Sequence, residues 1–91
     1  MKLSGEWVAV TLLAIGICVA AISGKDAVDK LVNDLGCSLL RVSGSHHIIQ
    51  CPGGCQASIP VHGNKDIPKG TLGNIRRSLR PCIPDINEHL K

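Results

Sequence analysis

The segment Cys51-Pro52-Gly53-Gly54-Cys55 constrains the fold of this chain more than any other feature of its sequence. A rigid proline and two conformationally permissive glycines stand between its two cysteines, and no regular strand or helix accommodates that combination. The segment therefore predicts a tight loop whose cysteines tie neighbouring parts of the chain together.

The amino terminus is typical of a secretory signal peptide. One lysine precedes an uncharged stretch at 7–22 that is rich in Val, Leu, Ile and Ala. Two cleavage sites fit the small-x-small rule, one before Gly24 and a competing one before Ile22. The uncharged stretch falls short of the ~20 residues that span a membrane comfortably. The sequence predicts residues 1–23 as a signal peptide, a secreted, extracellular protein and no stable membrane span.

Cleavage would also remove Cys18, so that residues 24–91 form one small domain with an even number of cysteines. In an oxidising compartment, four cysteines predict two disulfides, for which three connectivities exist. The only aromatic residue is Trp7, in the signal, so the core must consist of aliphatic side chains. A bridge closing about fifteen residues contributes ~3 kcal/mol, which is comparable with what so small a core can supply. The predicted disulfide cysteines are Cys37, Cys51, Cys55 and Cys82.

The spacing of apolar residues predicts a small disulfide-stabilised α+β domain. An N-terminal helix is expected first, then a short hairpin around Ser43-Gly44-Ser45, then a basic C-terminal helix that ends before Pro81. The expected elements are a helix that begins at Ser23 or Lys25 and ends before Gly36, hairpin strands at 39–42 and 48–50, an edge strand at 59–61, a helix at 71–80 and a turn from Asp85.

The middle of the chain carries an ordered set of short motifs. Cys37, an apolar pair at 48–49, the Cys-Pro-Gly-Gly-Cys segment and a Val-x-Gly at 61–63 follow one another. This order over residues 37–64 resembles the amino half of the LCCL domain of cochlin-like and vitrin-like secreted proteins. The resemblance implies that Cys37 pairs with Cys51 and Cys55 with Cys82. A bridge between Cys51 and Cys55 is the alternative.

Histidines and cysteines offer a second interpretation of the same region. Thiolates and imidazoles at these spacings can build a tetrahedral zinc site. Because thiols in an oxidising compartment form disulfides, we instead expect no metal and no cofactor. Adjacent histidines in a strand would then lie on opposite faces, with at least one exposed. The residues of this alternative site are His46, His47, Cys51, Cys55 and His62.

No arrangement typical of nucleophilic catalysis is found in the sequence. There is no Gly-x-Ser-x-Gly elbow and no ordered pair of histidine and aspartate, and the closeness of Ser58 and Ser78 to histidines is taken as coincidence. We therefore expect a protein that is not an enzyme.

Positive charge is concentrated between residues 65 and 80, where five basic residues accompany one acidic residue. Such groups suit sulfate, phosphate or lipid head groups. The sequence predicts a monomeric binding module for glycosaminoglycan or lipopolysaccharide, acting in extracellular matrix or innate defence. Export and the lack of stacking aromatics argue against a nucleic-acid partner. The predicted ligand-binding residues are Lys65, Lys69, Arg76, Arg77 and Arg80.

Other interpretations stay open. A secreted peptide effector, meaning a toxin, hormone or antimicrobial peptide acting on a membrane or cell-surface receptor, fits the small size and the cationic helix. The dibasic pair Arg76-Arg77 is also a possible processing site that would release residues 78–91. Alternatively, the basic helix is only a solvated face, or the chain is a structural product without binding activity.

Overall fold

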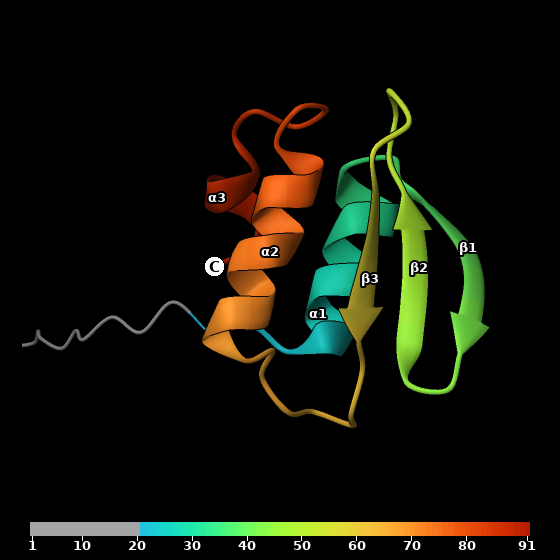
Figure 1. Ribbon diagram of the computed structural model, residues 1–91, viewed down its shortest axis with the longest axis vertical. Coiled ribbons are helices and arrows are strands. Elements are labelled where there is room, and N and C mark those ends of the chain that lie inside the picture. The colour runs from blue at the N-terminus through green and yellow to red at the C-terminus, as the bar shows by residue number, and fades with distance from the viewer. Residues whose placement is uncertain (1–20) are drawn as a thin grey trace, which may run out of the picture.

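The computed structural model describes residues 21–91, and Figure 1 shows the arrangement of its elements. Residues 1–20, which hold most of the predicted signal peptide, lie outside the described residues. The domain has the element order helix, three strands, helix, helix. The elements are α1 (Gly24–Asp29) continuing into η3 (Lys30–Asp34), β1 (Ser38–Ser43), β2 (His46–Gln50), β3 (Gln56–Pro60), α2 (Lys69–Leu79) and α3 (Ile86–His89).

The folded unit includes two residues that precede the predicted boundary at Gly24. Ser23 caps α1, since its hydroxyl accepts a hydrogen bond from the Asp26 amide at 3.1 Å. Ile22 is buried, and its carbonyl accepts from the Ile67 amide at 2.9 Å. A side chain at Gly24 would collide with the Pro60 carbonyl, because a Cβ there would lie 1.9 Å from that oxygen. Glycine therefore lets the first turn of α1 lie against the end of β3.

The sheet has the order β1-β2-β3, and both pairs are antiparallel. The hairpin turn places Gly44 at a φ of 60°, where glycine carries no steric penalty. The predicted hairpin strands are confirmed in place but are longer than expected, because His46 and His47 belong to β2. The third strand covers 56–60 instead of 59–61, and Pro60 lies at its last position. The molecule is an α+β domain, as predicted.

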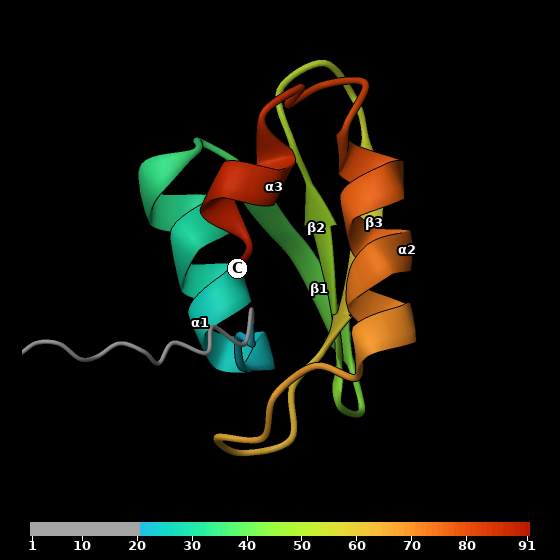
Figure 2. The same cartoon turned by 90° about the vertical axis from the view of Figure 1, so that its left-hand side faces the viewer.

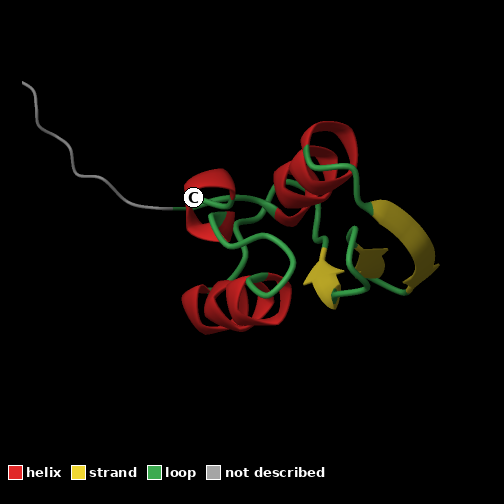
Figure 3. Cartoon of the chain, turned by 90° about the horizontal axis from the view of Figure 1, so that it is seen from above, coloured by secondary structure: helices red, strands yellow, loops and turns green. Residues whose placement is uncertain are grey.

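The helices pack on one face of the sheet, and Figure 3 shows the strands on one side of the molecule and the helices on the other. In Figure 2 the strands run behind α3, between α1 and α2. α1 and α2 both contact β3, and α3 contacts α2. The three apolar positions that predicted the second helix are all buried. The largest fully buried side chains are Leu31, Ile49, Ile59, Leu79, Ile86 and Leu90.

Two pairs of cysteines lie at disulfide distance. The sulfurs of Cys37 and Cys51 are 2.13 Å apart and join the start of β1 to the end of β2. Those of Cys55 and Cys82 are 2.04 Å apart and join the β2–β3 loop to the segment after α2. No helix within residues 21–91 has the length and apolar character needed to cross a membrane.

Candidate active site on the open face of the sheet

The pleat of β2 sends two neighbouring histidines to opposite faces of the sheet. His47 is paired with Ile59, which is fully buried, so this pair faces the helices. His46 is paired with Pro60 and faces the other way. We call that second side the open face, because no helix among the described residues packs on it (Figure 3).

His46 is exposed on the open face and is held by one side-chain contact. Its Nδ1 lies 3.2 Å from the Oγ of Ser58, which is exposed on β3. Ser58 is paired with Ile48, so the contact runs diagonally between the two strands. Within residues 21–91 the other ring nitrogen, Nε2, makes no hydrogen bond. The ring is therefore attached through one nitrogen and presents the other to solvent.

His47 has a different environment from its neighbour. It is half-buried between Val42 of β1 and Ile59 of β3. Its Nδ1 is buried and has no hydrogen-bond partner within residues 21–91. A buried ring nitrogen cannot exchange protons with a substrate easily, and His46 is the more exposed of the two rings, so His46 is the better candidate for chemistry.

Several segments that carry basic residues meet at the end of the sheet where β2 begins with His46. In Figure 1, β2 begins, β3 ends and α2 begins at this end, with loop 61–68 between the last two. The Val61 amide donates to the Ser45 carbonyl at 2.7 Å, which fixes the loop beside the hairpin. Lys65 belongs to this loop and Lys69 opens α2, and both are exposed.

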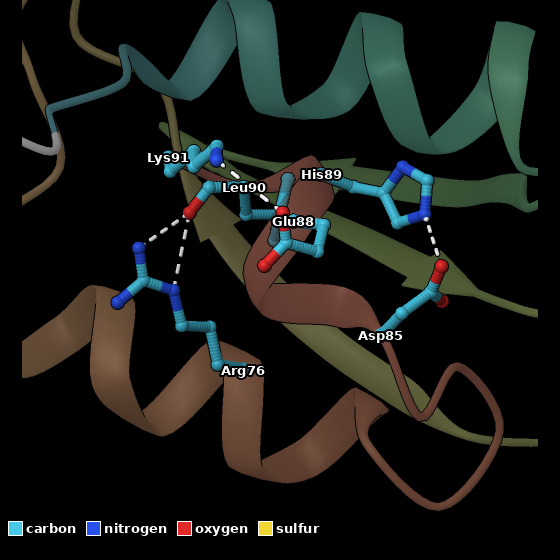
Figure 4. A network of polar contacts seen from close by, with 6 residues as sticks. All are labelled: Arg76, Asp85, Glu88, His89, Leu90 and Lys91. Carbon is cyan, nitrogen blue, oxygen red and sulfur yellow. Dashed lines mark hydrogen bonds and ion pairs between the residues drawn. The ribbon is translucent and has the colours of Figure 1, made fainter.

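The other three predicted ligand-binding residues are engaged within the domain. Arg76 is half-buried, and its Nε and Nη2 both donate to the Leu90 carbonyl, the first at 3.1 Å (Figure 4). Arg77 donates to Asn74 Oδ1 at 2.7 Å, and Arg80 donates to Asn87 Oδ1 at 3.3 Å. The predicted basic set is thus divided. Two lysines are exposed, one on loop 61–68 and one at the start of α2, whereas three arginines at the end of α2 are engaged within the domain.

The carboxyl-terminal segment forms a small polar network of its own. Figure 4 shows His89 Nε2 at 3.1 Å from Asp85 Oδ2, and Lys91 Nζ at 3.3 Å from Glu88 Oε1. Both are exposed pairs and contribute little to stability. The contact between Arg76 and the Leu90 carbonyl is more important, because it closes the segment over the buried side chain of Leu90.

The alternative zinc residues are not brought together. Cys51 and Cys55 lie at disulfide distance from other cysteines, and His46 and His47 face opposite sides of the sheet. The part of the chain from 21 onward contains no group of three metal-ligating side chains that could hold an ion.

Sequence reasoning missed the contact between His46 and Ser58. It considered His46 as a zinc ligand or as an exposed strand residue, and the second view is confirmed, but it took the serine as coincidence. The alternation of polar and apolar residues in 56–59 could have indicated that Ser58 shares a face with His46. That inference needs the register between β2 and β3, which the sequence alone does not provide.

Comparison with known proteins assigns the chain to a family. The family model of the HicA toxin of bacterial toxin-antitoxin matches residues 24–80, from the start of α1 to the end of α2. The match thus spans more than half of the chain and includes all three strands. No curated protein and no solved structure matches the chain.

This match corrects several predictions. The resemblance to the LCCL domain was wrong, because the same residues belong to a toxin family. The secreted module that binds polysaccharide or a receptor was wrong for the same reason, as was the extracellular location. The prediction that the protein is not an enzyme was also wrong, since HicA toxins are typically ribonucleases. Of the functions considered, only the alternative of a toxin agrees with the match. The chain belongs to the HicA toxin family of bacterial toxin-antitoxin systems.

Proposed function

We propose that this protein is a toxin that cleaves RNA, with His46 as the group that moves the proton. The observation that carries the proposal is the position of His46. It is an exposed imidazole on the open face, held at Nδ1 by Ser58 and free at Nε2 within the described residues, in a domain of a toxin family.

RNA carries its own nucleophile, the 2′-hydroxyl next to each phosphodiester. Nε2 of His46 takes the proton from this hydroxyl while the 2′-oxygen bonds to phosphorus and the bond from phosphorus to the 5′-oxygen breaks. The imidazolium then returns the proton to the departing 5′-oxygen. The products are a 2′,3′-cyclic phosphate and a 5′-hydroxyl, and the histidine is restored.

Binding of the RNA backbone falls to the basic residues at the same end of the sheet. Lys65 and Lys69 are exposed there, and ammonium groups bind phosphates as point charges. The prediction against a nucleic-acid partner rested partly on export, and the family match removes that ground. The lack of aromatic side chains beyond Trp7 remains, so we expect recognition through the backbone and through shape, not through base stacking.

The family also names the kind of partner. A toxin of a toxin-antitoxin pair is controlled by its antitoxin, so we propose an antitoxin protein in place of the predicted polysaccharide or receptor. The prediction that the toxin itself is a monomer stays a prediction.

The test is cleavage of a defined RNA oligonucleotide by the purified protein. We expect cyclic phosphate and 5′-hydroxyl ends, and we expect no cleavage at a position where the 2′-hydroxyl is replaced by hydrogen. The variant H46A should lose at least 100-fold in rate, which is the typical contribution of a general acid or base. H89A is the matched control, because His89 lies on α3 in a separate network. Equal activity of H46A and the wild type would overturn the proposal.

A further inference from the structure

We infer that Ser58 is a positioning residue that determines which ring nitrogen of His46 carries the proton. This inference rests on the proposed function of His46 and adds a second side chain to the same site. Ser58 does not touch the reacting atoms in this account. It acts on them only through the imidazole.

The structure fixes Ser58 better than a surface serine would ordinarily be fixed. Its neighbours in the chain are Ala57 and Ile59, which are 8% and 0% exposed and hold β3 against the helices. The next residue, Pro60, is paired with His46 itself. The Oγ therefore projects from a strand that is anchored in the core, and it lies 3.2 Å from Nδ1 of His46.

The Ser58 hydroxyl can accept a hydrogen bond from Nδ1–H, and Nδ1–H is the tautomer that a base acting at Nε2 requires. When Nδ1–H donates to the Ser58 Oγ, the lone pair of Nε2 points to solvent and can accept a proton. After Nε2 has taken that proton, Nδ1–H still donates to the same oxygen. The contact thus persists in the neutral ring and in the imidazolium, and no rearrangement is needed between the two proton transfers.

His47 is a histidine on the same strand without such a partner at Nδ1. Its Nδ1 is buried and has no hydrogen-bond partner in the described part of the chain, so no contact there selects its tautomer. The two histidines occupy successive positions on β2. Among the described residues, His46, on the same face as Ser58, has a partner at Nδ1, and His47 does not. The hydrogen-bond contact with Ser58 is thus the difference between the environments of Nδ1 in His46 and in His47.

The experiment compares S58A and S58T with the wild type, and uses S38A as the matched control. Ser38 is also an exposed serine of the sheet, but it is paired with Gln50 at the other end of β2. We expect S58A to lower kcat for RNA cleavage about 10-fold with little change in KM, because the ring then samples unproductive orientations. S58T keeps a hydroxyl and should recover most of the loss, while S38A should match the wild type.

A second readout does not depend on activity. The ¹⁵N chemical shifts of the His46 ring in the RNA-free protein report the tautomer. We expect the Nδ1–H form to predominate in the wild type and in S58T, and its share to fall in S58A. Unchanged ring shifts and unchanged kcat in S58A would overturn the inference. If H46A is inactive and S58A is fully active, only the role of Ser58 fails, whereas full activity of H46A removes the proposed function itself.

Discussion

The two faces of the sheet use the same three strands for different purposes. The inner face presents Ile49 and Ile59, both fully buried, to the helices. The open face presents His46 and Ser58, both exposed and in contact with each other. Because successive side chains of a strand point to opposite faces, the same strands carry the buried side chains and the exposed pair. We therefore expect substitutions on the inner face to change the free energy of unfolding and substitutions on the open face to change RNA cleavage.

The largest difference between the faces is expected on truncation of one isoleucine from each. Ile59→Ala should lower the free energy of unfolding by about 2–5 kcal/mol, because it opens a cavity in the core. Ile48→Ala on the open face should cost about 1 kcal/mol or less, since that side chain is only half-buried. Urea denaturation of both variants gives the two values. Equal losses would mean that the faces do not differ as described.

The pairing of Cys55 with Cys82 links the sheet to the helical side of the molecule. A bridge between positions separated by 27 residues should contribute roughly 3 kcal/mol, so C55A/C82A should unfold at clearly lower urea concentration. Peptide mapping without reduction tests the pairing directly. A bridge between Cys51 and Cys55 would contradict it.

The contact between Arg76 and the Leu90 carbonyl belongs to the helical side and should matter for stability alone. Arg76→Met should cost about 1–2 kcal/mol, because it removes a charge-assisted hydrogen bond to a half-buried carbonyl. Arg77→Met is the control, since Arg77 is exposed and its hydrogen bond among the described residues goes to Asn74 on the same helix. The RNA cleavage rate of both folded variants should equal that of the wild type. A large loss of cleavage in Arg76→Met with intact stability would place Arg76 in the RNA site instead.

Removing the two lysines at the end of the sheet should have the smallest effect on stability and a clear effect on RNA binding. K65A/K69A should change the free energy of unfolding by no more than about 0.5 kcal/mol, because both residues are exposed. It should weaken RNA binding and flatten the dependence of affinity on salt by about one ion per lost phosphate contact. Fluorescence anisotropy at several salt concentrations measures the slope. An unchanged slope would mean that neither lysine contacts phosphate.

Much of the fold could be predicted from the sequence, because apolar spacing reports burial directly. Leu72, Ile75 and Leu79 predicted the second helix, and all three are buried in it. The apolar pattern placed the start of β2 at 48, because His46 and His47 are polar and interrupt that pattern, although both histidines were expected in a strand on opposite faces. Ser23, one of the two expected helix starts, is the cap of α1. The burial of Ile22 was missed, because this residue lies in a stretch that reads as a signal peptide.

The candidate site could not be predicted, because its contacts join residues distant in the chain. His46 meets Ser58 through the strand register, and Arg76 meets a carbonyl that lies 14 residues further on. The resemblance to the LCCL domain failed for a related reason. It rested on cysteine spacing around a hairpin and a tight loop, and such spacing describes the local geometry of the loop without identifying the family.

The most direct test of the division between the two faces is to replace each neighbouring histidine in turn and to measure both RNA cleavage and unfolding. We expect H46A to lose cleavage at least 100-fold and to unfold at the wild-type urea concentration. H47L removes a buried, unpaired nitrogen, so it should keep cleavage and unfold at the same or a higher urea concentration. The opposite pattern, with cleavage lost in H47L and kept in H46A, would contradict the assignment of chemistry to the open face.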